Sequence, residues 1–151
     1  MKNIFLTIIF NVLVTTFNYA QEAGTNNNLE QDIYSLIDKY SQAREKNDTV
    51  LLKSILTAEV DQLVSSGEWR KGIDASIKGM LRSSENNPGT RQIKIEKMRF
   101  INSDFGIVDA RYEIKNTDGT ERNMWSTFIV VYDVGMWKIT AIRNMLPSRQ
   151  Q

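Results

Sequence analysis

Cysteine and histidine are both missing from this chain of 151 residues. Without cysteine there is no thiolate nucleophile and no disulfide, and without histidine there is no imidazole base. The same two absences remove the usual ligands of zinc and haem. Any chemistry must therefore use carboxylate, tyrosine, lysine or arginine side chains. We expect neither a metal site nor a cofactor.

An excess of charge of either sign is also absent. The 19 lysine and arginine residues nearly balance the 18 aspartate and glutamate residues, which leaves a formal net charge of +1. A chain so balanced has no general attraction for nucleic acid or for an anionic membrane surface, so we expect no nucleic-acid partner. The sequence has no glycine-rich phosphate loop, nucleophile elbow or calcium loop. Its length fits a single domain, and 41% apolar residues suffice for one core.

The first residues have the layout of an export signal. Lys2 is followed by an apolar stretch over residues 4–17, and Ala20 offers a cleavage point before a polar stretch. The apolar stretch is short for a membrane span, which needs about 20 residues. An uncleaved anchor or a buried helix is the alternative. We expect export to the periplasm or beyond the cell, with no stable membrane span after processing.

The predicted organisation follows from this signal and from the pattern behind it. We expect a signal peptide over residues 1–20, a linker over 21–28, one domain over 29–147 and a C-terminal tail over 148–151.

Helical periodicity dominates the first half of the domain. Apolar residues recur at helical spacing over 29–46, and Asp48 can cap a second, shorter helix over 50–56. An extended segment over 57–66 follows, and the spacing over 69–82 predicts a third helix.

The second half changes to a period of two. Four strands are predicted over 91–101, 106–114, 123–134 and 136–145, separated by short turns. Short turns between consecutive strands indicate an antiparallel meander. The sequence therefore predicts an α+β fold in which three N-terminal helices pack on a curved antiparallel sheet.

Several residues in this order resemble a known family. They are Tyr40-Ser41-Gln42-Ala43 with Asp48, then Gly67 and Gly72, and finally Gly135-Met136-Trp137-Lys138-Ile139. With the switch from helices to strands, they resemble the SnoaL-like branch of the nuclear transport factor two-like superfamily, over about residues 29–147. The resemblance implies a cystatin-like cone of helices on a curved sheet, with a pocket between the first helix and the concave face. The family includes isomerases, dehydratases, cyclases, epoxide hydrolases and subunits without catalysis, so the fold alone does not fix the function.

One carboxylate is a candidate for catalysis. Catalytic members of such a family pair a carboxylate base with hydrogen-bond donors, and Asp61 lies in a short, mainly apolar extended segment where burial would raise its pKa. The alternative is a solvated aspartate beside Glu59. Asp109 and Arg111 share one face of their strand, which is typical of a solvated sheet face with cross-strand ion pairs.

Four side chains are candidates for a ligand pocket. Tyr40, Tyr112 and Trp125 supply aromatic surface, and a tyrosine hydroxyl can donate to a carbonyl oxygen. Arg143 would reach into the pocket and hold a carboxylate if it shares the face of Trp137. The alternatives are ordinary core packing for the aromatic residues and a solvated strand end for the arginine.

Three interpretations follow from the sequence. The first is an exported, non-catalytic domain that binds a small apolar ligand carrying a carbonyl or acid group. The second is a cofactor-independent isomerase, cyclase or hydrolase that uses Asp61 as its base. The third is a homodimeric interaction module that pairs through the outer face of the sheet. Whether the protein is an enzyme stays open at this point.

Overall fold

The computed structural model describes residues 28–147. The predicted signal peptide, residues 21–27 of the predicted linker and the tail over 148–151 lie outside the described residues, so they stay predictions. The described residues divide into two units, residues 28–33 and residues 34–147. In the first unit, residues 28–33 are helical, and the second unit contains the sheet. Between residues 28 and 147, none of the helices is both long and apolar enough to cross a membrane.

The first helix ends where the sequence places its stop. Helical residues run from 28 to 46, and Asn47 takes a left-handed backbone conformation with φ of 53°. The amide of Asp48 donates to the carbonyl of Ala43 at 2.9 Å, which closes the helix end. The side chain of Asp48 then accepts from the amide of Leu51 at 2.9 Å and caps helix α2, Thr49–Ile55. The predicted cap is therefore confirmed.

The third predicted helix begins later than the spacing suggested. Trp69–Lys71 is not helical but forms a short strand, β2, and helix α3 covers Ile73–Asn86. Gly72 separates the two with a φ of 80°, a conformation that residues inside a right-handed helix do not adopt. Strand β2 pairs antiparallel with β1, Leu56–Leu63, which is the extended segment that the sequence predicts.

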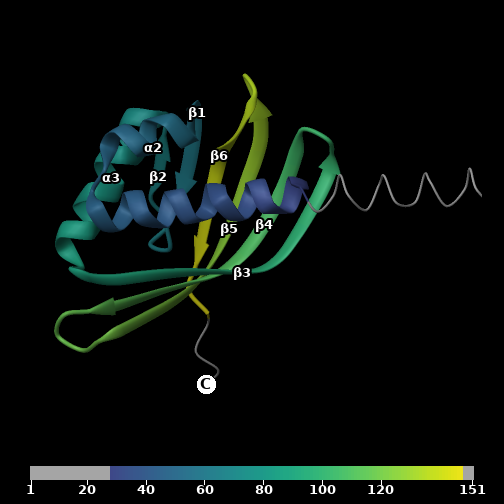
Figure 1. The fold of residues 1–151 in the computed structure, drawn as a ribbon. Coiled ribbons are helices and arrows are strands. Elements are labelled where there is room, and N and C mark those ends of the chain that lie inside the picture. The colour runs from purple at the N-terminus through teal and green to yellow at the C-terminus, as the bar shows by residue number, and fades with distance from the viewer. Residues whose placement is uncertain (1–27, 148–151) are drawn as a thin grey trace, which may run out of the picture. The chain divides into compact units, whose positions relative to one another are not determined.

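Among residues 28–147, six strands form one mixed sheet that is not closed. Their order is β2-β1-β6-β5-β4-β3 (Figure 1). The four later strands are β3 Gly89–Asn102, β4 Phe105–Asn116, β5 Glu121–Asp133 and β6 Met136–Met145. They form the predicted antiparallel meander. The sheet as a whole is mixed because β1 pairs in parallel with β6. Short-turn signals cannot reveal that pairing, since they report only on strands that follow one another.

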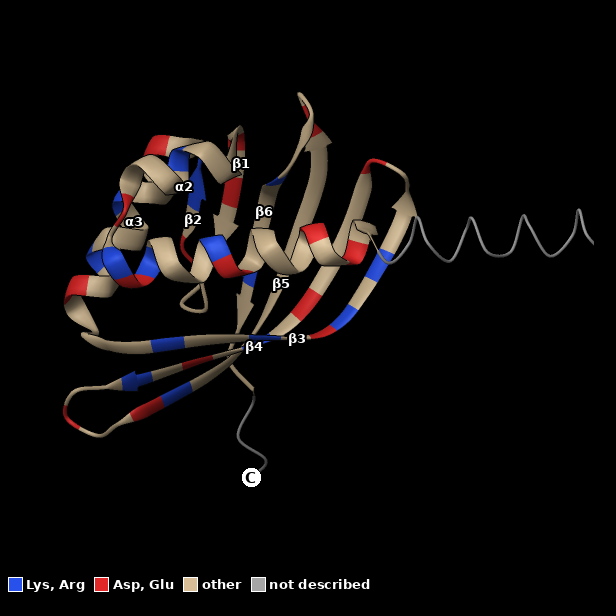
Figure 2. Ribbon diagram, viewed as in Figure 1, with Lys and Arg blue, Asp and Glu red and all other residues tan. Residues whose placement is uncertain are grey.

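The two faces of the sheet differ in burial. The inner face carries the buried side chains of strands β4 and β5, and helices α2 and α3 with residues 34–46 of the first helix pack on the sheet. Tyr40 of the first helix meets Phe128 of β5 edge to face, with ring centroids 5.4 Å apart. The predicted solvated face is present, with Asp109 and Arg111 pointing away from the buried side. Figure 2 shows acidic and basic residues of both signs along the elements.

Candidate functional site

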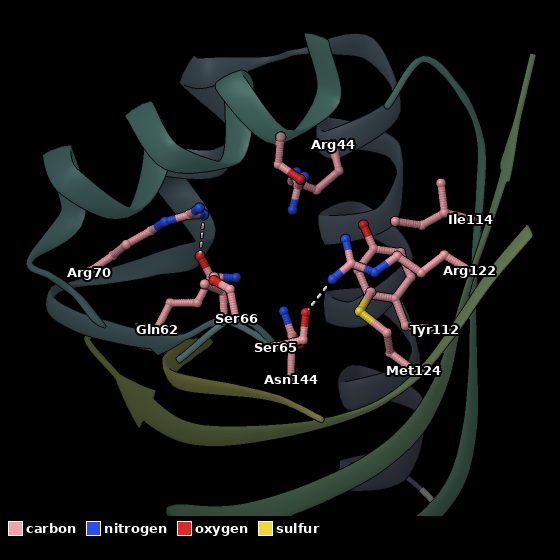
Figure 3. Close-up of a pocket in the computed structure, with 12 residues that line it drawn as sticks. Arg44, Gln62, Ser65, Ser66, Arg70, Tyr112, Ile114, Arg122, Met124 and Asn144 are labelled. Atoms are coloured by element: carbon pink, nitrogen blue, oxygen red, sulfur yellow. Dashed lines mark hydrogen bonds between the residues drawn. The ribbon is translucent and has the colours of Figure 1, made fainter. Parts of the chain in front are cut away.

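A pocket of about 150 Å³ lies on the inner side of the sheet, beneath α3 and the end of the first helix (Figure 3). Residues from most of the elements contribute to it. Its lining consists of Arg44, Gln62, Val64, Ser65, Ser66, Arg70, Ser83, Tyr112, Ile114, Arg122, Met124 and Asn144. Three of these residues are arginines and none is an aspartate or a glutamate. The pocket is therefore cationic, although the whole chain is nearly neutral.

Arg44 is the most buried of the three arginines. It is 5% exposed and follows Tyr40 by one turn of the first helix. Its guanidinium donates to the hydroxyl of Tyr40 at 3.2 Å, the carbonyl of Met80 at 3.1 Å and the hydroxyl of Ser84 at 3.3 Å. All three acceptors are neutral. A buried charge is costly without an opposite charge or strong hydrogen bonds, so these contacts hold the guanidinium in place without neutralising it.

Burial acts on the pKa values of this pair. It raises the pKa of Tyr40 above its ordinary value, so the phenol stays neutral. Burial alone would lower the pKa of Arg44, but the oxygens of Tyr40 and Tyr112 outweigh it, and the pKa lies above its ordinary value. Arg44 therefore carries its positive charge at neutral pH.

Arg70 of β2 enters the pocket beneath α3. It is 8% exposed, and it donates to the carboxylate of Glu68 at 3.1 Å and to the amide oxygen of Gln62 at 3.1 Å. The hydrogen bond and charge of Arg70, together with Arg82, lower the pKa of Glu68. Gly79 makes room for this arrangement, because a Cβ at this position would collide with the guanidinium of Arg70. Glycine is unfavourable inside a helix, so the space that Gly79 leaves for the side chain of Arg70 explains its presence here.

Arg122 of β5 lies on the side of the pocket opposite Arg70 (Figure 3). It is half-buried, and its guanidinium donates to the hydroxyl of Ser65 in the turn between β1 and β2. Tyr112 of β4 lies beside it, and its buried hydroxyl has no hydrogen-bond partner among the residues that the structure describes. Asn144 of β6 accepts from Ser126 at 2.7 Å through its oxygen. Arg122 and Tyr112 thus present hydrogen-bond donors on this side of the pocket.

The predicted pocket residues are not brought together. Tyr112 lines the pocket, whereas Tyr40 lies fully buried behind Arg44 and reaches the pocket only through that side chain. Trp125 lies on the outer face of the sheet, where the guanidinium of Arg111 stacks 3.4 Å from the centre of its ring.

Arg143 also lies on the outer face, for a reason that the alternation could not show. Ile129 of β5 pairs with Ala141 of β6, but the next residue of β5, Val130, pairs with Ile139. Thr140 therefore has no partner in β5 and is an extra residue in β6. One extra residue turns every later side chain of the strand to the opposite face of the sheet. Arg143 therefore does not share the face of Trp137, which was the condition for its predicted role.

On the outer face Arg143 meets the predicted catalytic residue. Its guanidinium lies 2.8 Å from the carboxylate of Asp61 and 4.7 Å from the ring centre of Trp69. The side chain of Asp61 is 34% exposed and does not line the pocket. A catalytic role for Asp61 stays a prediction, and it would require a site on the outer face.

The arginines of the pocket were missed in the sequence. Arg44 follows Tyr40 at the spacing that places both side chains on one helical face, which was a usable signal. Arg70 was assigned to a helix, so its inward direction could not be predicted. Arg122 is the second residue of β5, where alternation places its side chain on the same face as Met124.

The comparisons with known proteins give the fold. No protein-family model matches the sequence, and no curated protein matches it. Solved structures do match. An uncharacterised protein with a cystatin-like fold from Caulobacter vibrioides has a TM-score of 0.68 at 16% identity, over 80% of this chain and 90% of that one.

Two further structures agree. An NTF2-like protein of unknown function from Shewanella oneidensis MR-1 has a TM-score of 0.65 at 18% identity, over 77% of this chain and 98% of that one. An NTF2-like protein of unknown function from Pseudomonas putida KT2440 has a TM-score of 0.70 at 14% identity, over 83% of this chain and 91% of that one. The chain therefore has the cystatin-like, NTF2-like fold that its sequence resemblance predicted.

Proposed function

We propose that this protein is a binding domain for a small organic acid, held in the pocket between α3 and the inner face of the sheet. The observation that carries the proposal is the lining, which contains Arg44, Arg70 and Arg122 and no acidic residue. A carboxylate in the pocket would receive charge-assisted hydrogen bonds, each of which contributes about 1.5–3 kcal/mol. It would also supply the opposite charge that Arg44 lacks among the described residues.

The volume of the pocket limits the size of the ligand. A cavity of about 150 Å³ is known to hold benzene, so a ligand of about six to nine non-hydrogen atoms fits this pocket of about 150 Å³. Part of the lining is apolar, because Val64, Ile114 and Met124 belong to it. The best match is a compact acid with a short hydrocarbon part.

The first experiment is native mass spectrometry of the protein purified from its own host. A small mass that leaves on denaturation would identify a ligand. Titration calorimetry with short mono- and dicarboxylic acids then tests the pocket, and we expect Arg44→Gln to weaken binding at least about tenfold. Arg99→Gln is the matched control, because Arg99 pairs with Asp109 on the outer face. The proposal fails if no short acid binds, or if the two variants bind it equally.

Arg44 also holds helices together, so its replacement could unfold the protein. Tyr112→Phe provides a second variant, because it removes only a buried hydroxyl that has no described partner. We expect this variant to keep its thermal midpoint and to bind the acid more weakly. A Tyr112→Phe protein that binds as tightly as the wild type would place the ligand elsewhere.

Export belongs to the same proposal. The support is the layout of residues 1–20, with a single lysine before an apolar stretch and Ala20 at the proposed cleavage point. A domain that binds a small acid outside the cytoplasm would then act as a carrier or sensor.

We further propose a homodimer through the outer face of the sheet. Trp69 is 50% exposed there, and the guanidinium of Arg143 stacks on it. Trp125 with Arg111 forms a second stacked pair on the same face, and Met145 beside it is exposed. Tryptophan, arginine and methionine are enriched in interfaces. Sedimentation velocity tests this proposal, with Trp69→Ser expected to give a monomer, and a monomeric wild type at high concentration would refute it.

A further inference from the structure

The three arginines of the pocket differ in how their charges are balanced. Arg70 pairs with Glu68 at 3.1 Å, and Arg82 shares the same carboxylate at 3.2 Å. Arg44 and Arg122 donate only to neutral groups in the part of the chain that the structure describes. The pocket therefore holds two positive charges that no described carboxylate neutralises.

From this count we infer that the ligand is a short dicarboxylate, with one carboxylate at Arg44 and the other at Arg122. The inference rests on the proposed function and names its ligand class. A monocarboxylate would neutralise one guanidinium and leave the other unpaired in a small, partly closed space. Two carboxylates satisfy both, and charge-assisted hydrogen bonds are the strongest polar contacts available to either end.

The directions of the two arginines favour two separate acid groups. Arg44 comes from the first helix and Arg122 from β5, so they enter from different walls of the pocket (Figure 3). The guanidinium of Arg44 is fixed by three hydrogen bonds, which prevent it from moving towards Arg122. Tyr112 stands beside Arg122, and its unpartnered hydroxyl can donate to the carboxylate that Arg122 binds.

The rest of the lining suits a short hydrocarbon link between the acid groups. Ile114 and Met124 belong to a buried apolar cluster with Tyr112 and form one wall. A diacid of four or five carbons has about eight or nine non-hydrogen atoms, which agrees with the volume of the pocket. Inorganic phosphate also carries two charges, but it is smaller and has no apolar part to cover that wall.

The test compares three anionic probes, of which butanedioate and butanoate differ by one carboxylate and phosphate lacks the apolar part. Butanedioate, butanoate and inorganic phosphate are titrated into the full protein at constant ionic strength. We expect butanedioate to bind about 10- to 100-fold more tightly than butanoate, the ratio that one charged hydrogen-bonded contact gives. Arg122→Gln should weaken the binding of butanedioate but not of butanoate, so that the two affinities become equal. Arg122→Lys should restore part of the difference. Arg99→Gln should leave it unchanged.

The outcomes separate this inference from the proposed function. If butanoate binds as tightly as butanedioate, or if Arg122→Gln weakens both acids equally, the dicarboxylate inference is overturned and the acid-binding pocket stands. Phosphate binding more tightly than either acid overturns the inference as well. If neither acid binds to the folded wild type, both conclusions fall. Arg122 is half-buried at the pocket, and an unchanged thermal midpoint shows that its variants are folded.

Discussion

Replacement of Gly79 by alanine should destabilise this protein, although the same change stabilises most helices. Gly79 lies inside α3, where alanine is more favourable than glycine by about 1 kcal/mol. Here the new Cβ would lie about 2.5 Å from Cδ and Cζ of Arg70, closer than non-bonded atoms approach. The buried side chain of Arg70 must therefore leave its position.

The cost of moving Arg70 exceeds the gain in helix propensity. Its hydrogen bond to Glu68 has an exposed partner and contributes little. Its hydrogen bond to Gln62 is buried, and the amide oxygen that loses its donor costs about 1–3 kcal/mol. We expect Gly79→Ala to lower the free energy of unfolding by up to about 2 kcal/mol after the helix gain of about 1 kcal/mol is subtracted.

Urea unfolding followed by far-ultraviolet circular dichroism measures this effect. The control is the same substitution in an Arg70→Ala background, where the space is free and Gly79→Ala should raise the free energy of unfolding by up to about 1 kcal/mol. A change of sign between the two backgrounds is the expected result. If Gly79→Ala stabilises both proteins equally, Arg70 does not hold the position described here and the account of the pocket's wall is wrong.

Three further predictions follow from other features. The affinity for butanedioate should be constant from about pH 7 to about pH 9, because both of its carboxyl groups are ionised there, the chain has no histidine, the pKa values of Arg44 and Tyr40 are raised and the pKa of Glu68 is lowered. Calorimetry across this range checks this expectation, and a titration midpoint inside the range would contradict it. The pKa of Glu68 is lower in the folded protein than in the unfolded chain, so its ionised carboxylate stabilises the fold at any pH above the unfolded pKa. This stabilisation is lost as the pH falls through the folded pKa. Asp48→Ala removes the cap of α2 and should cost about 1 kcal/mol in urea unfolding, with Asp104→Ala in an exposed turn as the control. N-terminal sequencing of the exported protein should begin at Gln21, and an intact Met1 would refute cleavage.

Much of the fold could be predicted because the relevant signals are local. The cap at Asp48 and the alternation from Val108 to Ile114 depend on neighbouring residues, and both agree with the structure. Trp69–Lys71 could not be predicted correctly, because a strand of three residues is too short to show a period of two. Its pairing with β1 decides its conformation, and that contact is tertiary.

The site was less predictable than the fold. Its lining comes from helices, strands and a turn, so no single stretch of sequence displays it. Arginines are mostly exposed in proteins, so the inward direction of Arg44 and Arg70 runs against the usual expectation. Arg143 is the opposite case, because the sequence predicts an inward side chain and the extra residue Thr140 turns it to the outer face.

The parallel pairing of β1 with β6 makes the order of folding depend on the end of the chain. Asp61 and Arg143, which meet across this pair, are 82 residues apart. Contacts of such long range form late, because closing the loop between them costs entropy before any contact repays it. During synthesis, β1 and the turn that follows it must wait for the last strand to emerge. We expect the cationic pocket to form late in folding, because its lining joins Gln62 of β1 to Asn144 of β6, and a chain that stops before β6 lacks this wall of the site.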